Sequence, residues 1–550
     1  MAAADVIVTG ARLFTGSGQP LSGKAMVIAD GRIVALVTED AIGSYRGPLT
    51  RIVDVEGCLV APGFQDAHIH PVGGGVELMQ CSLTEAEDAA DALARLDAYA
   101  TENSEGWILG GGWSMDHFPG GAPGRRLLDD VVGDRPVLLS SRDHHSVWAS
   151  SAAIRAAGID AATPDPVDGR IEREVDGFPA GTFHEGAADL FTEVRPAVDD
   201  DLAYEGLLRA QEELLKLGIT GWQDAMVGEG FAGMPGNLQA YRRALAENTL
   251  VAHVVGAQWW VRDAGAEQIV GMIDRRAEFA AIDSDRLRLG TVKIMVDGVA
   301  ENFTAAMKNP YLDGHGHETE NSGLSFIDPQ RLTEYVTELD REGFQVHFHA
   351  LGDRAVQEAL DAIEAARAAN GASDGRHHLA HLQVVAEDDA ARFAPLGAVA
   401  NLQALWACHE AQLDELTLPF LQPELEARQY PFGDLQRQGV RLAAGSDWPV
   451  SSADPIAAIH IAVNRVSPGR HDAPLGGESQ RIDIETAFAA YTSGSAYVNH
   501  READTGSIAP GYRADFVVIE PDPFSVPAAD IYKSVVVSTW VDGAPVYVRN

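Results

Sequence analysis

The sequence has little cysteine, little positive charge and no long hydrophobic run. Its three cysteines, Cys58, Cys81 and Cys408, show no repeated spacing, so they do not form the disulfide framework of a small secreted protein. No apolar stretch reaches the ~18 residues of a membrane-spanning helix. The first residues lack the basic and apolar segments of a signal peptide. We therefore expect a soluble, cytoplasmic protein.

The scarcity of positive charge also limits the possible partners. The chain has 41 lysine and arginine residues against 81 aspartate and glutamate residues, so its formal net charge is -40. Such a surface repels phosphate backbones and anionic lipids, which argues against nucleic acid and membrane partners. A hydrophobic fraction of 46% is typical of a globular protein. A length of 550 residues is sufficient for two or three domains.

Both ends of the chain show β-strand patterns. Residues 25–37 and 535–547 each contain two β-rich runs around an Asp-Gly pair, which predicts a β-hairpin. Because the termini of a domain often lie close together, we expect residues 1–60 and 505–550 to form one small composite β-sandwich. Residues 61–504 would form the main body.

The main body alternates between strand and helix patterns from about residue 202 onwards. With the stretch before His70, eight strand patterns occur, at residues 60–70, 219–224, 251–256, 287–298, 345–349, 378–381, 398–401 and 441–447. Such alternation predicts parallel strands and an α/β fold, a (β/α)₈ barrel of the TIM type. The region of about 72–200 does not alternate in this way. We expect it to be a subdomain, inserted after the first strand, that packs over the barrel.

Residues that can bind metal lie at the ends of these strands. His68 and His70 form a His-x-His at the end of the first strand, where alternate side chains point the same way. His349, His381 and Asp447 end the fifth, sixth and eighth strands. Each residue alone has a simpler interpretation, such as a hydrogen-bonded core histidine or a turn cap. Their convergence at one barrel mouth favours a metal site.

Lys293 lies inside an apolar run, Thr-Val-Lys-Ile-Met-Val, in the fourth strand. A buried lysine loses its charge readily, because the interior disfavours the cation. The neutral amine can add carbon dioxide to form a carbamate, an anionic oxygen ligand that can bridge two metal ions. The alternative is a lysine that extends to the barrel rim. Lysine is otherwise rare, at Lys24, Lys216, Lys308 and Lys533.

Together these motifs resemble the amidohydrolase superfamily, in particular the YtcJ-like branch (amidohydrolase family 3) that includes N-substituted formamide deformylases. The resemblance covers nearly the whole chain and lies in residues 62–71, 111–113, 143–148, 185–186, 293–298, 349–355, 381, 445–449 and 511–515. Residues 403–409 depart from the Gln-Pro-x-His-like phrase that relatives often show after the seventh strand.

The resemblance implies a metal-dependent hydrolase that cleaves a C–N bond of an N-substituted amide or formamide-type small molecule through a metal-bridging hydroxide. Asp447 would take the proton from the attacking water and pass it to the leaving nitrogen. The resemblance also implies two zinc ions per chain, the first on His68, His70 and Asp447 and the second on His349 and His381, bridged by Lys293 as N6-carboxylysine.

The inserted region would cover and shape the substrate pocket through Trp113, His145 and Glu185, with Trp406 from the barrel. His144 precedes His145, and either histidine could face the site. The alternatives are a carbamate or cyclic amide hydrolase, a mononuclear deaminase-like hydrolase with unmodified Lys293, and a non-catalytic binding or regulatory protein. The complete ligand set argues against the last of these. We also expect a homodimer.

Overall fold

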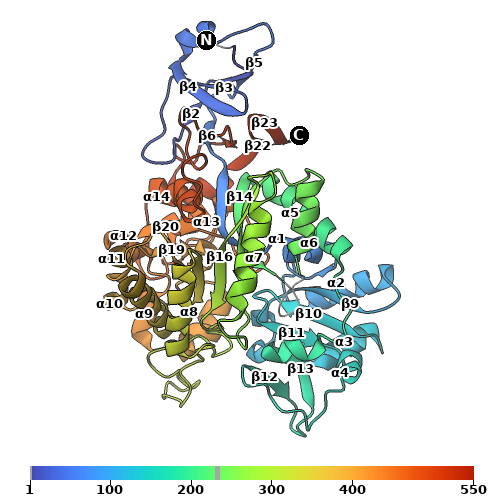
Figure 1. Ribbon diagram of the computed structural model, residues 1–550. Helices are drawn as coiled ribbons and strands as arrows, with labels where there is room; N and C mark the ends of the chain where they lie inside the picture. The colour runs from blue at the N-terminus through green and yellow to red at the C-terminus, as the bar shows by residue number, and fades with distance from the viewer. Residues whose placement is uncertain (1–2, 229–235, 550) are drawn as a thin grey trace.

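The computed structural model describes residues 3–228 and 236–549, and its largest sheet has eight strands (Figure 1). Neighbouring strands of this sheet are parallel throughout. The strands are β7 (Phe64–Ile69), β14 (Ile219–Val227), β15 (His253–Trp259), β16 (Leu287–Met295), β17 (Gln345–Ala350), β18 (His378–His381), β19 (Val399–Leu402) and β20 (Arg441–Ala444). They lie side by side in the order of the chain.

The first and last strands of this sheet meet at their carboxyl ends. The Asp447 N–H donates to the His68 carbonyl at 2.7 Å, and the His70 N–H donates to the Trp448 carbonyl at 2.9 Å. A side chain at Gly445 would place its Cβ 2.6 Å from the His68 nitrogen, so this close approach requires glycine. The strands therefore form a nearly closed barrel, which confirms the predicted (β/α)₈ fold.

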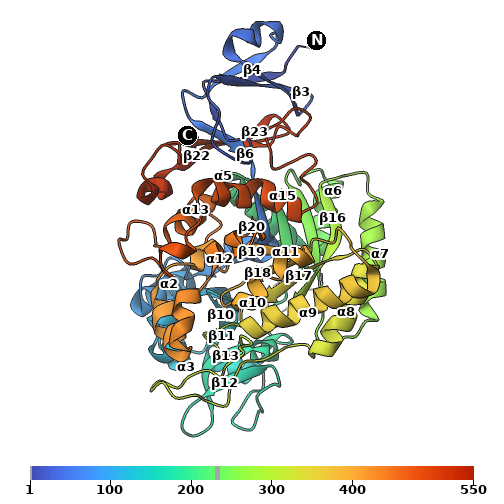
Figure 2. The ribbon, with the colours of Figure 1, turned by 90° about the vertical axis from the view of Figure 1, so that its left-hand side faces the viewer.

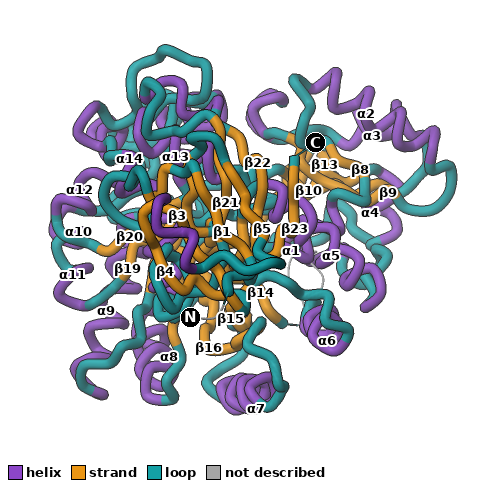
Figure 3. Tube along the Cα trace, turned by 90° about the horizontal axis from the view of Figure 1, so that it is seen from above, coloured by secondary structure: helices purple, strands orange, loops and turns teal. Residues whose placement is uncertain are grey.

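Helices surround the barrel, as the view along its axis shows (Figure 3). The larger ones are α5 (Asp200–Lys216), α6 (Leu238–Ala246), α7 (Gln268–Ala280), α8 (Pro329–Arg341), α9 (Asp353–Asn370) and α13 (Pro455–Asn464). Aspartate side chains cap the first turns of several of these helices. Asp199, for example, accepts a hydrogen bond from the backbone of Leu202 in α5.

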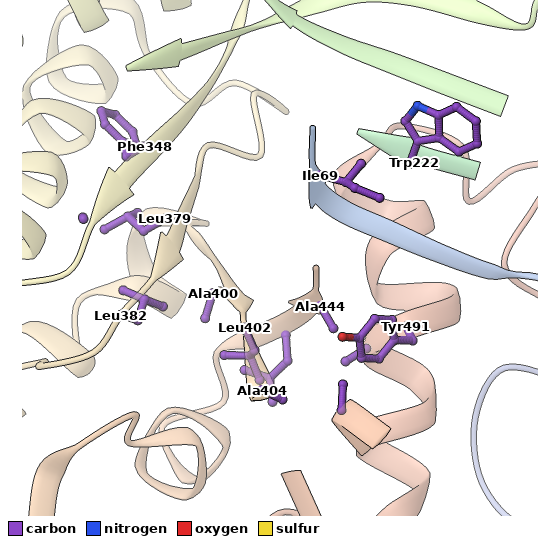
Figure 4. Close-up of a cluster of buried hydrophobic side chains, with 14 of the residues drawn as sticks. Ile69, Trp222, Phe348, Leu379, Leu382, Ala400, Leu402, Ala404, Ala444 and Tyr491 are labelled. Carbon is purple, nitrogen blue, oxygen red and sulfur yellow. The ribbon is translucent and has the colours of Figure 1, made fainter. Parts of the chain in front are cut away.

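Alternation along the strands separates the apolar core from the barrel interior. In β17, Val346 and Phe348 belong to the large apolar cluster beneath the helices, whereas His347 and His349 point into the barrel. Figure 4 shows part of this cluster, in which Phe348, Leu379, Ala400 and Ala444 come from four neighbouring strands. The polar side chains of these strands therefore point into the barrel and line its interior.

Strands from both ends of the chain share one sheet. Its order is β2 (Arg12–Leu13), β6 (Leu59–Pro62), β21 (Phe516–Glu520), β22 (Val535–Val541) and β23 (Ala544–Val548). A second sheet has the order β4 (Arg32–Thr38), β3 (Lys24–Ala29), β1 (Val6–Thr9) and β5 (Arg51–Asp54). Val8 and Met26 of this sheet pack in one apolar cluster with Phe516 and Trp540 of the other.

The segment between β7 and α5 forms a further sheet of six strands. Their order is β12 (Gly169–Arg173), β13 (Pro179–Glu185), β11 (Ser146–Ala149), β10 (Val137–Ser141), β9 (Ile108–Trp113) and β8 (Cys81–Ser82). The same segment contains four helices, α1 (Pro71–Glu77), α2 (Ala89–Glu102), α3 (Arg125–Val132) and α4 (Ser151–Ala156). Figures 1 and 2 show this segment at one end of the barrel and the terminal sheets at the other. Among the described residues, no helix is both long and apolar enough to cross a bilayer.

Candidate active site

Side chains from the carboxyl ends of the barrel strands line a small chamber of about 70 Å³. The chamber contains all six predicted metal ligands, with His145 and Glu185 from the inserted segment. The six are His68, His70, Lys293, His349, His381 and Asp447, and each is at most 9% exposed.

The backbone at the strand ends is shaped to present these side chains. His70 precedes Pro71, the first residue of α1, so the strand stops directly after the His-x-His. His381 and Asp447 have φ values of 78° and 58°, a left-handed conformation that costs roughly 1–3 kcal/mol in non-glycine residues and clusters at functional sites. The Asp66 carboxylate accepts backbone hydrogen bonds from both His68 and Ser446, each at 3.0 Å. Asp66 thereby ties the first strand to the loop after the last strand.

Within the chamber, His68, His381 and Asp447 form a group of possible metal ligands. One ligand atom from each lies within 4.8 Å of the other two. Nε2 of His68 and Nε2 of His70 each lie 3.0 Å from Asp447 Oδ1. Nevertheless, within the described chain Asp447 Oδ1 and both ring nitrogens of His381 lack a hydrogen-bond partner. Buried polar atoms without partners are rare and cost about 1–3 kcal/mol each, so this donor set fits a divalent ion.

A chain of buried hydrogen bonds sets the tautomer of His68. The Gln223 amide nitrogen donates to Asn499 Oδ1 at 3.0 Å, so its Oε1 is the acceptor, and it lies 2.7 Å from Nδ1 of His347. His347 therefore carries its proton on Nδ1 and accepts at Nε2, which lies 2.8 Å from Nδ1 of His68. His68 must then be protonated on Nδ1, which leaves the Nε2 lone pair facing Asp447.

The other site histidines are also suited to metal binding. His349 donates from Nδ1 to the Asp297 carboxylate at 3.3 Å, which leaves its Nε2 as the ligand atom. Asp297 is held in turn by backbone N–H groups of Ala306, Leu351 and Gly352. Burial lowers the pKa of His349 well below its usual value. A neutral imidazole is the form that coordinates a metal.

Lys293 lies among these histidines and is 1% exposed. Burial lowers the pKa of Lys293 to about 7, although the Asp447 carboxylate opposes this shift. No hydrogen bond or ion pair holds the Lys293 ammonium within the described part of the chain. A substantial fraction of this amine is therefore uncharged near neutral pH, as carbamate formation requires.

His145 and Glu185 form a buried ion pair at the chamber wall. His145 Nδ1 lies 2.9 Å from Glu185 Oε2, and Glu185 also accepts a hydrogen bond from Thr304 at 2.7 Å. Burial lowers the pKa of His145, but Glu185 outweighs it and raises the pKa to about 9. His145 is therefore a cation whose ring lies 5.7 Å from that of His349. His144 instead pairs with Glu77 at 3.2 Å, although it also lines the chamber.

The two predicted tryptophans differ in position. Trp406 stacks on His381, with ring centroids 5.4 Å apart and an angle of 18° between the rings. Trp113 is fully buried in the inserted segment, where its Nε1 donates to the Leu139 carbonyl and its ring packs against Trp148. The structure does not bring Trp113 to the site. Trp113 ends strand β9, and its side chain packs in the apolar core of that sheet.

A larger cleft of about 640 Å³ adjoins the chamber, and Asp143 and Val450 line both. Sequence reasoning did not find most of the polar cleft residues, which come from the inserted segment and from loops after several strands. They include Glu77, Arg142, Glu301 and Glu410. No motif or spacing marks these residues, because they meet only in the folded chain.

Comparison with known proteins agrees with this geometry. A sequence profile described as "Amidohydrolase family" matches residues 51–547. The chain belongs to the amidohydrolase family. This amidohydrolase is 29% identical to the putative amidohydrolase YtcJ of Bacillus subtilis, over 96% of each chain. It is 27% identical to the N-substituted formamide deformylase of Arthrobacter pascens, over 99% of each chain. Both relatives confirm the branch that the sequence motifs indicate.

A solved structure supports the fold of this amidohydrolase independently. An uncharacterized metal-dependent hydrolase from Pyrococcus horikoshii OT3 superposes with a TM-score of 0.72 at 23% identity, over 95% of this chain and 99% of that chain. The family membership makes this protein a hydrolase that acts on C–N bonds. The family is generally metal-dependent, and the unpartnered histidine and aspartate atoms provide a place for the metal.

Proposed function

We propose that this amidohydrolase cleaves the C–N bond of an N-substituted amide or formamide-type small molecule in the chamber at the barrel mouth. The main support is the cluster of His68, His381 and Asp447, in which both ring nitrogens of His381 and Oδ1 of Asp447 are buried without a hydrogen-bond partner in the described chain. The likeness to the N-substituted formamide deformylase supports the substrate class.

We further propose a centre of two zinc ions. When bound, such ions polarise the substrate carbonyl and make water acidic enough to lose a proton near neutral pH. The uncharged amine of Lys293 supports its conversion to N6-carboxylysine, whose oxygens would bridge the ions. The remaining ligands would be His68, His70 and Asp447 for one ion, and His349 and His381 for the other.

The protein's own side chains would move the proton and stabilise the developing charge. Asp447 Oδ1 has no hydrogen-bond partner in the described chain and can accept the proton of the attacking water. Asp447 would then deliver this proton to the nitrogen as the C–N bond breaks, giving a carboxylic acid and an amine. His145, kept cationic by Glu185, faces the same chamber and can donate to the carbonyl oxygen as it becomes negative.

The proposal is tested with metal-stripped and zinc-reconstituted protein and a panel of N-substituted formamides and small amides. We expect release of the amine only from the reconstituted protein. Lys293→Ala should lose most bound metal and turnover, and added acetate or propionate should partly restore both by supplying bridging oxygens. Full activity in a metal-free protein would contradict the proposal. An unmodified lysine in active, metal-loaded protein, detected by mass spectrometry, would contradict the carbamate.

One observation favours a second candidate, a hydrolase with a single metal ion. The ligand group at the chamber, His68 with His381 and Asp447, combines residues that the two-ion arrangement assigns to different ions. A single ion held by these three residues would leave Lys293 unmodified. Metal content per chain, measured together with activity during zinc titration, distinguishes the two candidates, because full activity at one ion per chain supports the second.

A further inference from the structure

The chamber and the adjoining cleft differ greatly in size. The chamber holds about 70 Å³, whereas the cleft holds about 640 Å³. The chamber therefore offers much less room beside the reacting centre than the cleft does. This difference favours a small group on one side of the scissile bond, such as a formyl or short acyl group. The other side has room for a much larger substituent in the cleft.

Carboxylates predominate among the charged groups of this cleft. Glu301 accepts one hydrogen bond, from Thr417 at 2.8 Å. The side chain of Glu410 has neither a hydrogen bond nor an ion pair within the described chain, and Oδ2 of Asp143 is buried without a partner. Arg142 lines the cleft with them and donates to the Thr84 carbonyl at 3.2 Å, and the cationic His145 of the adjoining chamber also acts on Asp143 and Glu301. Negative charge in the cleft is therefore only partly compensated.

The surroundings make this uncompensated charge costly. Glu410 lines the cleft, and desolvation there raises its pKa to about 7, although Arg142 lowers it. Burial also raises the pKa of Glu301. Carboxylates in such a place are stabilised by a cation that enters the cleft.

Aromatic rings complete the lining. Trp406 and Trp448 are partly buried and Tyr430 is 5% exposed, and all three line the cleft. The faces of aromatic rings attract organic cations, by roughly 0.5–2 kcal/mol depending on desolvation. Leu405 and Leu413 add apolar surface between these groups. Carboxylates, aromatic rings and aliphatic side chains together suit an alkyl chain that carries a protonated amine.

We infer that the substrate is a basic amide: a small acyl or formyl group on one nitrogen of a diamine-like molecule whose second, protonated nitrogen lies among Glu301, Glu410 and Asp143. This inference rests on the proposed amide hydrolysis and names its substrate class. Hydrolysis would consume one water molecule and yield a short carboxylic acid and the free diamine.

The test compares three amides of matched length with the zinc-loaded full-length enzyme. N-formyl-1,6-diaminohexane is cationic, N-formylhexylamine is neutral and N-formyl-6-aminohexanoate is anionic. We expect kcat/KM to fall about tenfold or more from the cation to the neutral amide, and further to the anion. Hydrolysis of the neutral amide as fast as the cationic one would overturn the inference while leaving the proposed function intact.

Variants of the cleft carboxylates test whether these residues cause the preference for the cationic amide. Glu410→Gln and Glu301→Gln should each reduce the ratio of kcat/KM for the cationic over the neutral amide at least threefold, with little change for the neutral amide. Glu415→Gln is the matched control, because Glu415 is exposed on the neighbouring turn and does not line the cleft. An unchanged ratio in both cleft variants would overturn the inference.

A binding measurement separates the inference from the proposed function. If neither these three amides nor the wider panel of formamides and amides is hydrolysed, the proposed function fails, and calorimetric titration with 1,6-diaminohexane then tests the cleft alone. Binding that weakens in Glu410→Gln but not in Glu415→Gln supports a cation site. The cation site is overturned if 1,6-diaminohexane does not bind, or if the unchanged enzyme, Glu410→Gln and Glu415→Gln bind it with equal affinity.

Discussion

The barrel has a cluster of histidine and aspartate at each end, and the two clusters look alike as donor sets. At the mouth, ligand atoms of His68, His381 and Asp447 lie within 4.8 Å of one another. At the opposite end, where the terminal sheets pack, ligand atoms of His253, Asp515 and Asp542 meet the same criterion. Residue type and spacing alone would assign a metal to both clusters.

The second cluster already contains its positive charges. Nη1 of Arg286 lies 3.0 Å from Nε2 of His253, and the other Arg286 nitrogen pairs with Asp542. Arg513 also pairs with Asp542, at 2.7 Å. His253 lies 3.1 Å from the Asp515 carboxylate. Guanidinium groups thus compensate the Asp542 carboxylate and contact His253, and the cluster ties strand β15 to the terminal sheet.

The cluster at the mouth has no guanidinium partner of this kind among the described residues. The nearby amine of Lys293 loses its charge readily. The comparison teaches that the supply of positive charge, more than the donor set, distinguishes a metal site from a structural ion-pair network. Four predictions test this distinction.

Removal of metal should have the largest effect. Chelation should abolish turnover almost completely, and restored zinc should recover it. Loss of an ion present at 1,000 times its Kd also removes about 4 kcal/mol of stability, measurable by thermal unfolding. His68→Ala should lose bound metal, whereas Asp515→Asn should retain the full amount. A loss of metal in Asp515→Asn would show that the second cluster also binds metal, against the distinction between the two clusters.

Asp447→Asn should lower kcat by about 10²–10⁴-fold, because the amide cannot accept the proton of water. The amide oxygen can still face a metal, so metal content should fall less than in His68→Ala. Steady-state kinetics and metal analysis of the same preparations check both points. Near-normal kcat with full metal would show that another group carries the proton.

The pair of His145 and Glu185 should make stability depend on pH. Because the folded protein raises the pKa of His145 from about 6.5 to about 9 and lowers that of Glu185 from about 4.5 to about 2, the pair contributes fully between about pH 4.5 and pH 6.5. This contribution, about 3 kcal/mol, should be lost as the pH rises through 9. Urea unfolding at pH 6 and pH 9.5 measures it, and Glu185→Gln should flatten the difference. An equal pH dependence in Glu185→Gln would contradict the assignment.

Arg286→Gln should have the smallest effect, a loss of about 1 kcal/mol of stability, because Arg286 and Asp542 are partly exposed and solvent screens their charges. The catalytic constant and the metal content should not change, since Arg286 lies at the opposite end of the barrel. Chemical unfolding and kinetics of the purified variant test this. A fall in kcat of tenfold would mean that the two ends are coupled.

The sequence by itself determined the barrel and the identity of the residues in its mouth. Alternation between strand and helix patterns requires parallel strands, and the carboxyl ends of parallel strands in a barrel meet on one face. A His-x-His, an isolated lysine in an apolar run and an aspartate after a strand therefore had to converge there. Each of these signals is local, so a single sequence carries it.

Only the tertiary structure decided how those residues are used. The tautomer of His68 depends on His347 and Gln223, which come from two other strands. The resemblance implied that Trp113 shapes the substrate pocket, yet it packs inside the inserted sheet. The charge of the cleft depends on Glu301 and Glu410, and the contrast between the two clusters depends on Arg286. These properties arise from distances between residues far apart in the chain, which no local pattern records.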